Sequence, residues 1–126
     1  MKFFILTSTF CLLAVASYAG PICFAHRGGG WNYFENSISA VDGAIKENFE
    51  GTEIDLHQTK DGEIILLHDD NLSRVAFGAN CPLEVAVKDL EYSVIKENCK
   101  LNNREDIPTL DAAYNLIRGN KILLIL

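Results

Sequence analysis

The feature that most constrains the fold is the stretch of residues 121–126, which reads Lys-Ile-Leu-Leu-Ile-Leu. Strand side chains point alternately to opposite faces, so a strand of this composition is apolar on both. Such a strand needs packing partners on both faces, which is typical of a parallel sheet covered by helices. A second short apolar run, residues 21–25, has the same character. The two runs predict an α/β protein.

The sequence between these runs predicts the element order of an α/β barrel. A helix opens at residues 35–37, where Asn36 or Ser37 can cap it, and a strand follows at 52–57. Strand, helix and strand within about 35 residues form a βαβ unit with parallel strands. Together with strands expected at 63–68 and 121–126, this order predicts about the first half of a (β/α)8 barrel. A complete barrel takes about 200–250 residues, so we expect a truncated chain.

Residues 1–19 have the pattern of a secretory signal peptide. Lys2 precedes a mostly apolar stretch over residues 3–16, and the segment ends in Ser17-Tyr18-Ala19. A membrane anchor is the alternative, but the run is short for a bilayer and contains the polar residues 7–9. We expect cleavage after Ala19, a secreted or periplasmic protein without a stable membrane anchor, and a domain over residues 20–126.

The charge of the mature chain limits its partners. Without Lys2 it carries ten Lys and Arg residues against 17 Asp and Glu, a net charge of −7. This balance argues against nucleic acid or an anionic membrane as the main partner. It is compatible with a small anionic substrate bound through a metal ion and one arginine.

Three cysteines remain once Cys11 is removed with the signal segment. An oxidising compartment permits a disulfide, and Cys81 and Cys99 are the candidate pair because they lie in one linking region. Spacing alone does not fix this connectivity. Cys23 lies in an apolar run and is expected to pack as a small hydrophobic residue.

Two carboxylates mark a candidate site. Glu53 and Asp55 flank Ile54 on the predicted strand, so both point to one face, about 6.5–7 Å apart along the backbone. After a tight turn at residues 59–62, the next strand ends in His68. Hard divalent cations prefer carboxylate oxygens. The arrangement predicts a cation site beside a group that can exchange protons.

A histidine and an arginine end the first predicted strand. His26 and Arg27 precede Gly28-Gly29-Gly30, which lets the backbone turn sharply and approach a ligand. Both side chains can contact a phosphate, and arginine can do so with two parallel hydrogen bonds.

The ordered set of motifs resembles the glycerophosphodiester phosphodiesterase family. The motifs are His26-Arg27-Gly28-Gly29, Glu35-Asn36-Ser37, Glu53-Ile54-Asp55, Thr59-Lys60-Asp61-Gly62, His68-Asp69-Asp70 with Leu72 and Arg74, and Ile107-Pro108-Thr109-Leu110. The resemblance implies a TIM barrel that hydrolyses small-molecule glycerophosphodiesters to glycerol 3-phosphate and an alcohol.

The resemblance also implies a role for each matching residue. His26 and His68 correspond to the general acid/base pair, without a division of the two roles. Arg27 corresponds to the residue that holds the phosphate. Glu53 and Asp55 correspond to two ligands of a divalent cation, Mg²⁺ or Ca²⁺.

Two departures from the family pattern leave alternatives open. The family supplies a third acidic ligand from the strand at 121–126, and this sequence ends before one appears. His57 stands where a glutamine or another polar residue is common. On strand alternation it shares the face of Glu53 and Asp55, where we expect an outer-shell or surface role. The alternatives are a lysophospholipid or sphingolipid phosphodiesterase of the same superfamily and an inactive truncated fragment that binds phosphate.

Overall fold

The computed structural model describes residues 21–29, 32–120 and 122–125. The expected signal segment, residues 1–19, lies outside this part of the chain. Within it, no helix is long and apolar enough to cross a membrane.

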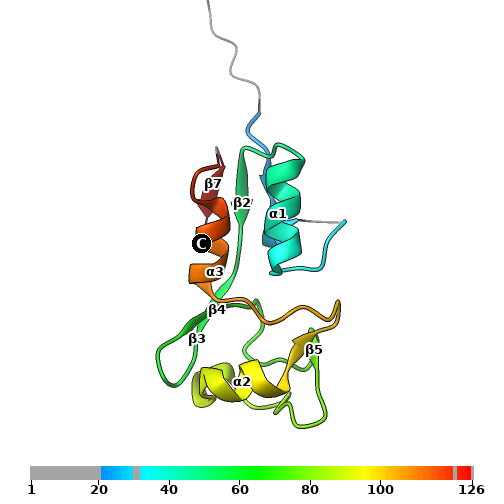
Figure 1. The fold of residues 1–126 in the computed structure, drawn as a ribbon, viewed down its shortest axis with the longest axis vertical. Helices are drawn as coiled ribbons and strands as arrows, with labels where there is room; N and C mark the ends of the chain where they lie inside the picture. The colour runs from blue at the N-terminus through cyan, green and yellow to red at the C-terminus, as the bar shows by residue number, and fades with distance from the viewer. Residues whose placement is uncertain (1–20, 30–31, 121, 126) are drawn as a thin grey trace, which may run out of the picture.

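A three-stranded parallel sheet forms one layer of the molecule (Figure 1). Its strands are β1 (Phe24–Ala25), β2 (Gly51–Glu53) and β7 (Leu123–Ile125), in the order β1-β2-β7. Thr52 lies in register with Ala25 on one side and with Leu124 on the other. The helix α1 (Ile38–Lys46) connects β1 to β2, so the expected βαβ unit is present.

Both helices beside the sheet begin at a capping hydroxyl. The side chain of Ser37 accepts a hydrogen bond from the backbone N–H of Ala40, and Thr109 does the same for Ala112 at the start of α3 (Leu110–Ile117). The apolar sides of α1 and α3 pack with the sheet in one core, which contains the fully or nearly fully buried residues Val41, Ile54, Leu66, Ala113 and Ile117. This arrangement of parallel strands and covering helices is a part of an α/β barrel.

The predicted strand 52–57 breaks in two, which corrects the expected topology. β2 ends at Glu53, and β3 (Leu56–Gln58) pairs antiparallel with β4 (Ile64–Leu66) in a separate hairpin. The strand expected at 63–68 is therefore not a barrel strand. The reason is the short turn before it, where Gly62 has φ = 93°, because parallel strands need a crossover of a dozen or more residues.

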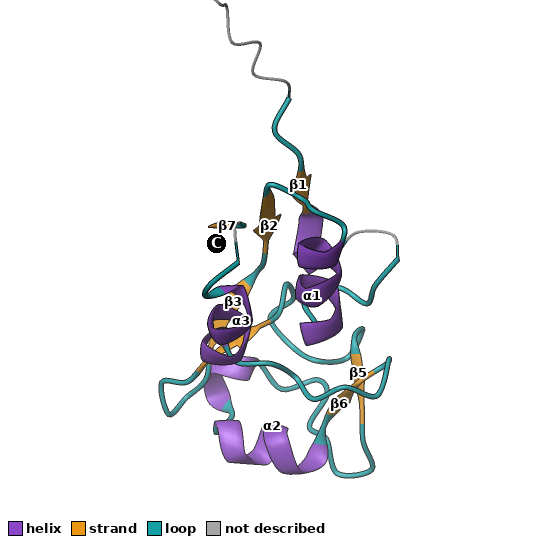
Figure 2. Cartoon of the chain, turned by 45° about the horizontal axis from the view of Figure 1, so that its top comes forward, coloured by secondary structure: helices purple, strands orange, loops and turns teal. Residues whose placement is uncertain are grey.

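The chain between β4 and α3 forms a second layer with a core of its own. It contains β5 (Ala76–Phe77), the 3₁₀ turn η2 (Val87–Asp89), α2 (Tyr92–Asn98) and β6 (Lys100–Leu101), and β5 pairs antiparallel with β6. Figure 2 shows α2, β5 and β6 well away from β1 and β2. A disulfide between Cys81 and Cys99, with Cα atoms 5.0 Å apart, closes this layer. This disulfide confirms the candidate pair that the sequence predicted.

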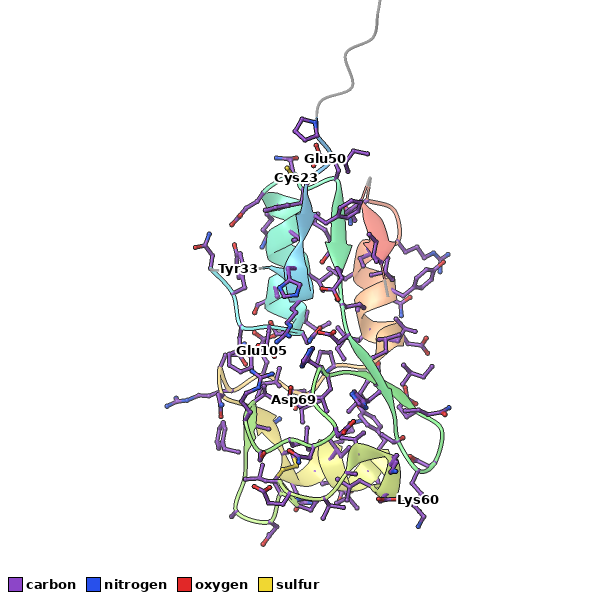
Figure 3. The ribbon with its side chains drawn as sticks, turned by 180° about the vertical axis from the view of Figure 1, so that it is seen from behind. Cys23, Tyr33, Glu50, Lys60, Asp69 and Glu105 are labelled. Atoms are coloured by element: carbon purple, nitrogen blue, oxygen red, sulfur yellow. A yellow bond between two sulfur atoms is a disulfide. The ribbon has the colours of Figure 1, made fainter. Side chains whose placement is uncertain are left out.

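The expectation that Cys23 packs in the interior is wrong, because Cys23 is exposed. It precedes β1, which lies at the edge of the sheet, and its backbone N–H donates to a carboxylate oxygen of Glu50. Figure 3 shows Cys23 and Glu50 at one end of the sheet and Asp69 beyond the other end. The carboxyl ends of the parallel strands thus face the second layer.

Candidate active site

The turn after β1 carries His26 and Arg27 at the carboxyl end of the sheet. It is the 3₁₀ turn η1 (His26–Gly28), in which Arg27 takes the left-handed value φ = 51°. The backbone N–H of Arg27 donates to Oε2 of Glu53 at 2.8 Å. Gly28 has φ = 92°, and a Cβ there would lie 2.9 Å from the Cβ of Ala40. The turn is therefore fixed against both β2 and α1.

Glu53 and Asp55 lie on either side of the fully buried Ile54 and approach the same arginine. Oδ2 of Asp55 lies 3.6 Å from Nε of Arg27, and Oε2 of Glu53 lies 4.0 Å from Nε2 of His26. The structure therefore brings four of the predicted site residues together, although the strand that was expected to align the two acids ends between them.

Asn36 holds Asp55 in place, whereas the sequence predicted only a possible helix cap for this residue. It is buried, its side-chain N–H donates to Oδ2 of Asp55 at 2.9 Å, and its Oδ1 accepts from the backbone N–H of Asp55 at 3.1 Å. Its own backbone N–H donates to the carbonyl oxygen of Arg27. Asn36 has φ = 52°, a conformation that asparagine tolerates better than most residues. The asparagine just before the cap at Ser37 was the available signal.

The guanidinium of Arg27 contacts two carboxylates, those of Glu35 and Asp55. Nη1 donates to both carboxylate oxygens of Glu35, each at 3.2 Å. Nε is buried and has no hydrogen-bond partner among the described residues. A buried donor without a partner costs free energy unless a ligand or water satisfies it. Oδ2 of Asp55 lies 3.6 Å from this Nε, an ion-pair distance that is too long for a hydrogen bond, so the guanidinium lies between the carboxylates of Glu35 and Asp55.

His68 begins a second set of charged contacts. Its Nδ1 lies 2.7 Å from Oδ1 of Asp69, whose other oxygen accepts from Nε of Arg74 at 2.6 Å. Arg74 also donates to both oxygens of Glu35, at 3.0 and 2.6 Å. The Arg74 guanidinium, followed by His68, holds the pKa of Asp69 well below its usual range, and Arg74 likewise lowers the pKa of Glu35. A continuous set of contacts therefore links His68 to Arg27.

His57 belongs to β3, and its Nε2 lies 3.2 Å from the backbone oxygen of His68. Because β2 ends at Glu53 and His57 lies in β3, strand alternation does not fix the face of His57 relative to Glu53 and Asp55.

The carboxylates of Glu53 and Asp55 suit a hard cation that takes its remaining ligands from water or from the substrate. Glu53 and Asp55 offer carboxylate oxygens on one side of the turn. Among the described residues, no group of three or more His, Cys, Asp or Glu is arranged to hold a metal ion. Mg²⁺ usually keeps several waters and binds through one or two carboxylates together with substrate phosphate. Two carboxylates beside an arginine, a side chain that can bind phosphate, fit that pattern.

Comparisons with known proteins identify the family of this chain. The model of the glycerophosphoryl diester phosphodiesterase family matches residues 26–124. A glycerophosphodiester phosphodiesterase of Caldanaerobacter subterraneus is 34% identical over 110 residues, which cover 82% of this chain and 43% of that protein. A human lysophospholipase D is 40% identical over 68 residues, which cover 54% of this chain and 20% of that protein.

A solved structure extends the likeness to three dimensions. An Oleispira antarctica phosphodiesterase in complex with the product sn-glycerol-3-phosphate aligns with a TM-score of 0.70 at 27% identity. The match covers 82% of this chain and 43% of that one, so the chain spans less than half the length of these relatives. With the family model matched over residues 26–124 and the turn, acids and helices in the places described above, the chain belongs to the glycerophosphoryl diester phosphodiesterase family.

Proposed function

We propose that this protein is a metal-dependent phosphoric diester hydrolase that cleaves a glycerophosphodiester to glycerol 3-phosphate and an alcohol. The observation that carries the proposal is the convergence of His26, Arg27, Glu53 and Asp55 at the carboxyl ends of β1 and β2. Barrel enzymes place their active sites at this end of the strands. The family match and the product complex of the Oleispira relative support the same reaction class.

Each group has a part in this reaction. Glu53 and Asp55 would hold Mg²⁺ or Ca²⁺, which neutralises phosphate charge when it is bound. Arg27 would bind a phosphate oxygen through the part of its guanidinium that Glu35 leaves unoccupied. Of His26 and His68, one would take a proton from the attacking water or hydroxyl, and the other would give a proton to the leaving alcohol. Imidazole suits both steps because its ordinary pKa lies near neutrality.

We further propose that the protein works outside the cytoplasm, secreted or in a periplasm. The disulfide between Cys81 and Cys99 supports this location, because such bonds persist in oxidising compartments. The signal-like residues 1–19 support it independently.

The test is hydrolysis of glycerophosphocholine by the chain from residue 20 onward, with Mg²⁺, with Ca²⁺ and with a chelator. We expect metal-dependent release of glycerol 3-phosphate that is lost in His26→Ala and in His68→Ala. His57→Gln is the matched control, because it changes the third histidine of the sequence. No release from a chain that circular dichroism shows to be folded would overturn the proposal.

A lysophospholipid is the second candidate substrate. The likeness to a human lysophospholipase D favours it. Lysophosphatidylcholine, presented in the same assay below its micelle concentration, separates the two substrates by the ratio of their kcat/KM values. A ratio in favour of the acylated substrate would assign the lysophospholipid.

A further inference from the structure

His68 and Asp69 are adjacent in sequence, yet their side chains face each other in a defined geometry. Nδ1 of His68 lies 2.7 Å from Oδ1 of Asp69. An ionised carboxylate can only accept hydrogen bonds. At this distance, Nδ1 must therefore carry the proton. In the neutral ring, the free lone pair is then on Nε2.

The carboxylate of Asp69 cannot easily rotate away from the ring. Nε of Arg74 donates to its Oδ2 at 2.6 Å, and Nη2 of Arg74 donates to its Oδ1 at 3.1 Å. This two-point contact fixes the plane of the carboxylate. The 28% exposed fraction of the Asp69 side chain is compatible with a defined orientation, whereas the His68 side chain is 45% exposed and open to a ligand.

Arg74 is itself held by Glu35 and by the packing of its own loop. Its guanidinium donates to both oxygens of Glu35, which lies 39 positions earlier in the chain. The backbone of its loop is anchored by the buried residues Leu72 and Val75, and the Leu72 N–H donates to the carbonyl oxygen of Leu83. Because Glu35 also binds Arg27, the contacts that orient His68 extend as far as Arg27.

We propose that Asp69 is the positioning residue of His68, with Arg74 fixing the carboxylate so that Nε2 of His68 is the nitrogen that exchanges a proton with the substrate. This inference rests on the proposed hydrolase function. In the step it serves, Nε2 accepts a proton to give imidazolium, or returns that proton, while Nδ1 keeps its own and Asp69 stays ionised. The charge of Asp69 stabilises the imidazolium, and its geometry fixes the tautomer.

The first test does not depend on activity. In the ¹⁵N-labelled chain, two-bond ¹H–¹⁵N correlations report the tautomer of each neutral histidine, and His26→Gln and His57→Gln assign the His68 signals by difference. We expect the Nδ1–H tautomer for His68. The Nε2–H tautomer in the unmutated chain would overturn the proposal, whatever the variants do.

The variant Asp69→Asn sharpens the test. A carboxamide has only one oxygen, and the two donors of Arg74 would bind it. The NH₂ group of the new side chain would then face the ring of His68, and Nδ1 would accept a hydrogen bond from it. We expect His68 to change to the Nε2–H tautomer in Asp69→Asn and to keep Nδ1–H in Asp70→Asn, the matched control at the neighbouring carboxylate. An unchanged tautomer in Asp69→Asn would contradict the role given to Asp69.

Kinetics then separate the two proposals. With glycerophosphocholine, we expect Asp69→Asn to lower kcat about 100-fold, the scale of a general acid/base contribution, with KM changed less than about threefold. A kcat equal to that of the unmutated chain would overturn the positioning role. If no chain hydrolyses the substrate but the tautomers are as expected, the proposed function fails and the assignment of Asp69 to His68 stands.

Discussion

The backbone N–H of Arg27 donates a hydrogen bond of 2.8 Å to Oε2 of Glu53, which lies 26 positions further along the chain. Arg27 follows the first parallel strand and Glu53 ends the second. The bond therefore holds the left-handed turn of Arg27 at the carboxyl end of the sheet. It also places a carboxylate beside Arg27, so one side chain supports the turn and, in the proposed function, would bind the cation.

Glu53→Ala and Glu53→Gln separate these two functions. Alanine leaves a partly buried N–H without an acceptor, so we expect the free energy of unfolding to fall by about 1–3 kcal/mol. Glutamine keeps an oxygen acceptor and should cost less than about 1 kcal/mol. Both lack the charge, so both should lose any stabilisation by Ca²⁺. Urea unfolding with and without Ca²⁺ measures both effects, and equal losses in the two variants would contradict the support role.

A second prediction concerns Asn36, whose φ of 52° and side-chain bonds to Asp55 are separable. Asn36→Gly removes the hydrogen bonds but accepts the positive φ. Asn36→Ala removes them and adds left-handed strain of about 1–2 kcal/mol. We expect alanine to be the less stable variant in chemical denaturation by about that difference. Equal stability of the two variants would show that the backbone at Asn36 relaxes freely.

Local chemistry explains what could be predicted of this fold. The caps at Ser37 and Thr109 are short-range signals, and the glycine turn at Gly62 is another. Glu53 and Asp55 both lie beside Arg27, with the buried Ile54 between them in the sequence, even though the strand ladder ends at Glu53. These features depend on a few neighbouring residues, which a sequence displays directly.

The rest depends on contacts between distant segments. Glu35 and Arg74 are 39 positions apart and meet only once the second layer folds against the sheet. No spacing rule pairs them, so the contacts that link His68 to Arg27 stayed unpredicted. The exposure of Cys23 has a similar origin, because it depends on β1 being an edge strand.

A third prediction concerns the second layer, whose disulfide joins Cys81 and Cys99 over a separation of 18 residues. Cross-linking a loop of this size restricts the unfolded chain and contributes about 3 kcal/mol. We expect the double variant Cys81→Ala, Cys99→Ala to lose stability by about that amount. Cys23→Ser is the matched control, since Cys23 is a free and exposed thiol. A denaturation midpoint unchanged in the double variant would argue that the bond adds nothing to this layer.

The last prediction concerns pH, because Arg74 lowers the pKa of both Glu35 and Asp69 in the folded chain. A carboxyl group whose pKa is lower in the folded chain than in the unfolded chain stabilises the fold. This stabilisation is fully present when the pH is above the unfolded-state pKa, which is about 4 for these groups. The stabilisation is lost as the pH falls through the folded value, since the unfolded state then binds more protons. Stability should therefore decrease below about pH 4.

Arg74→Gln tests this origin directly. The side chain of Arg74 is 47% exposed, so we expect a modest loss of about 1 kcal/mol at pH 7. The difference in the free energy of unfolding between the unmutated chain and Arg74→Gln should become smaller as the pH drops from 5 to 2. Protonated carboxyl groups carry no charge, so they no longer form ion pairs with the guanidinium. Arg118→Gln, at the exposed end of α3, is the control and should follow the unmutated chain at each pH. Urea titrations across this range measure the difference, and a difference that is independent of pH would mean that Arg74 stabilises the fold by packing and not by its charge.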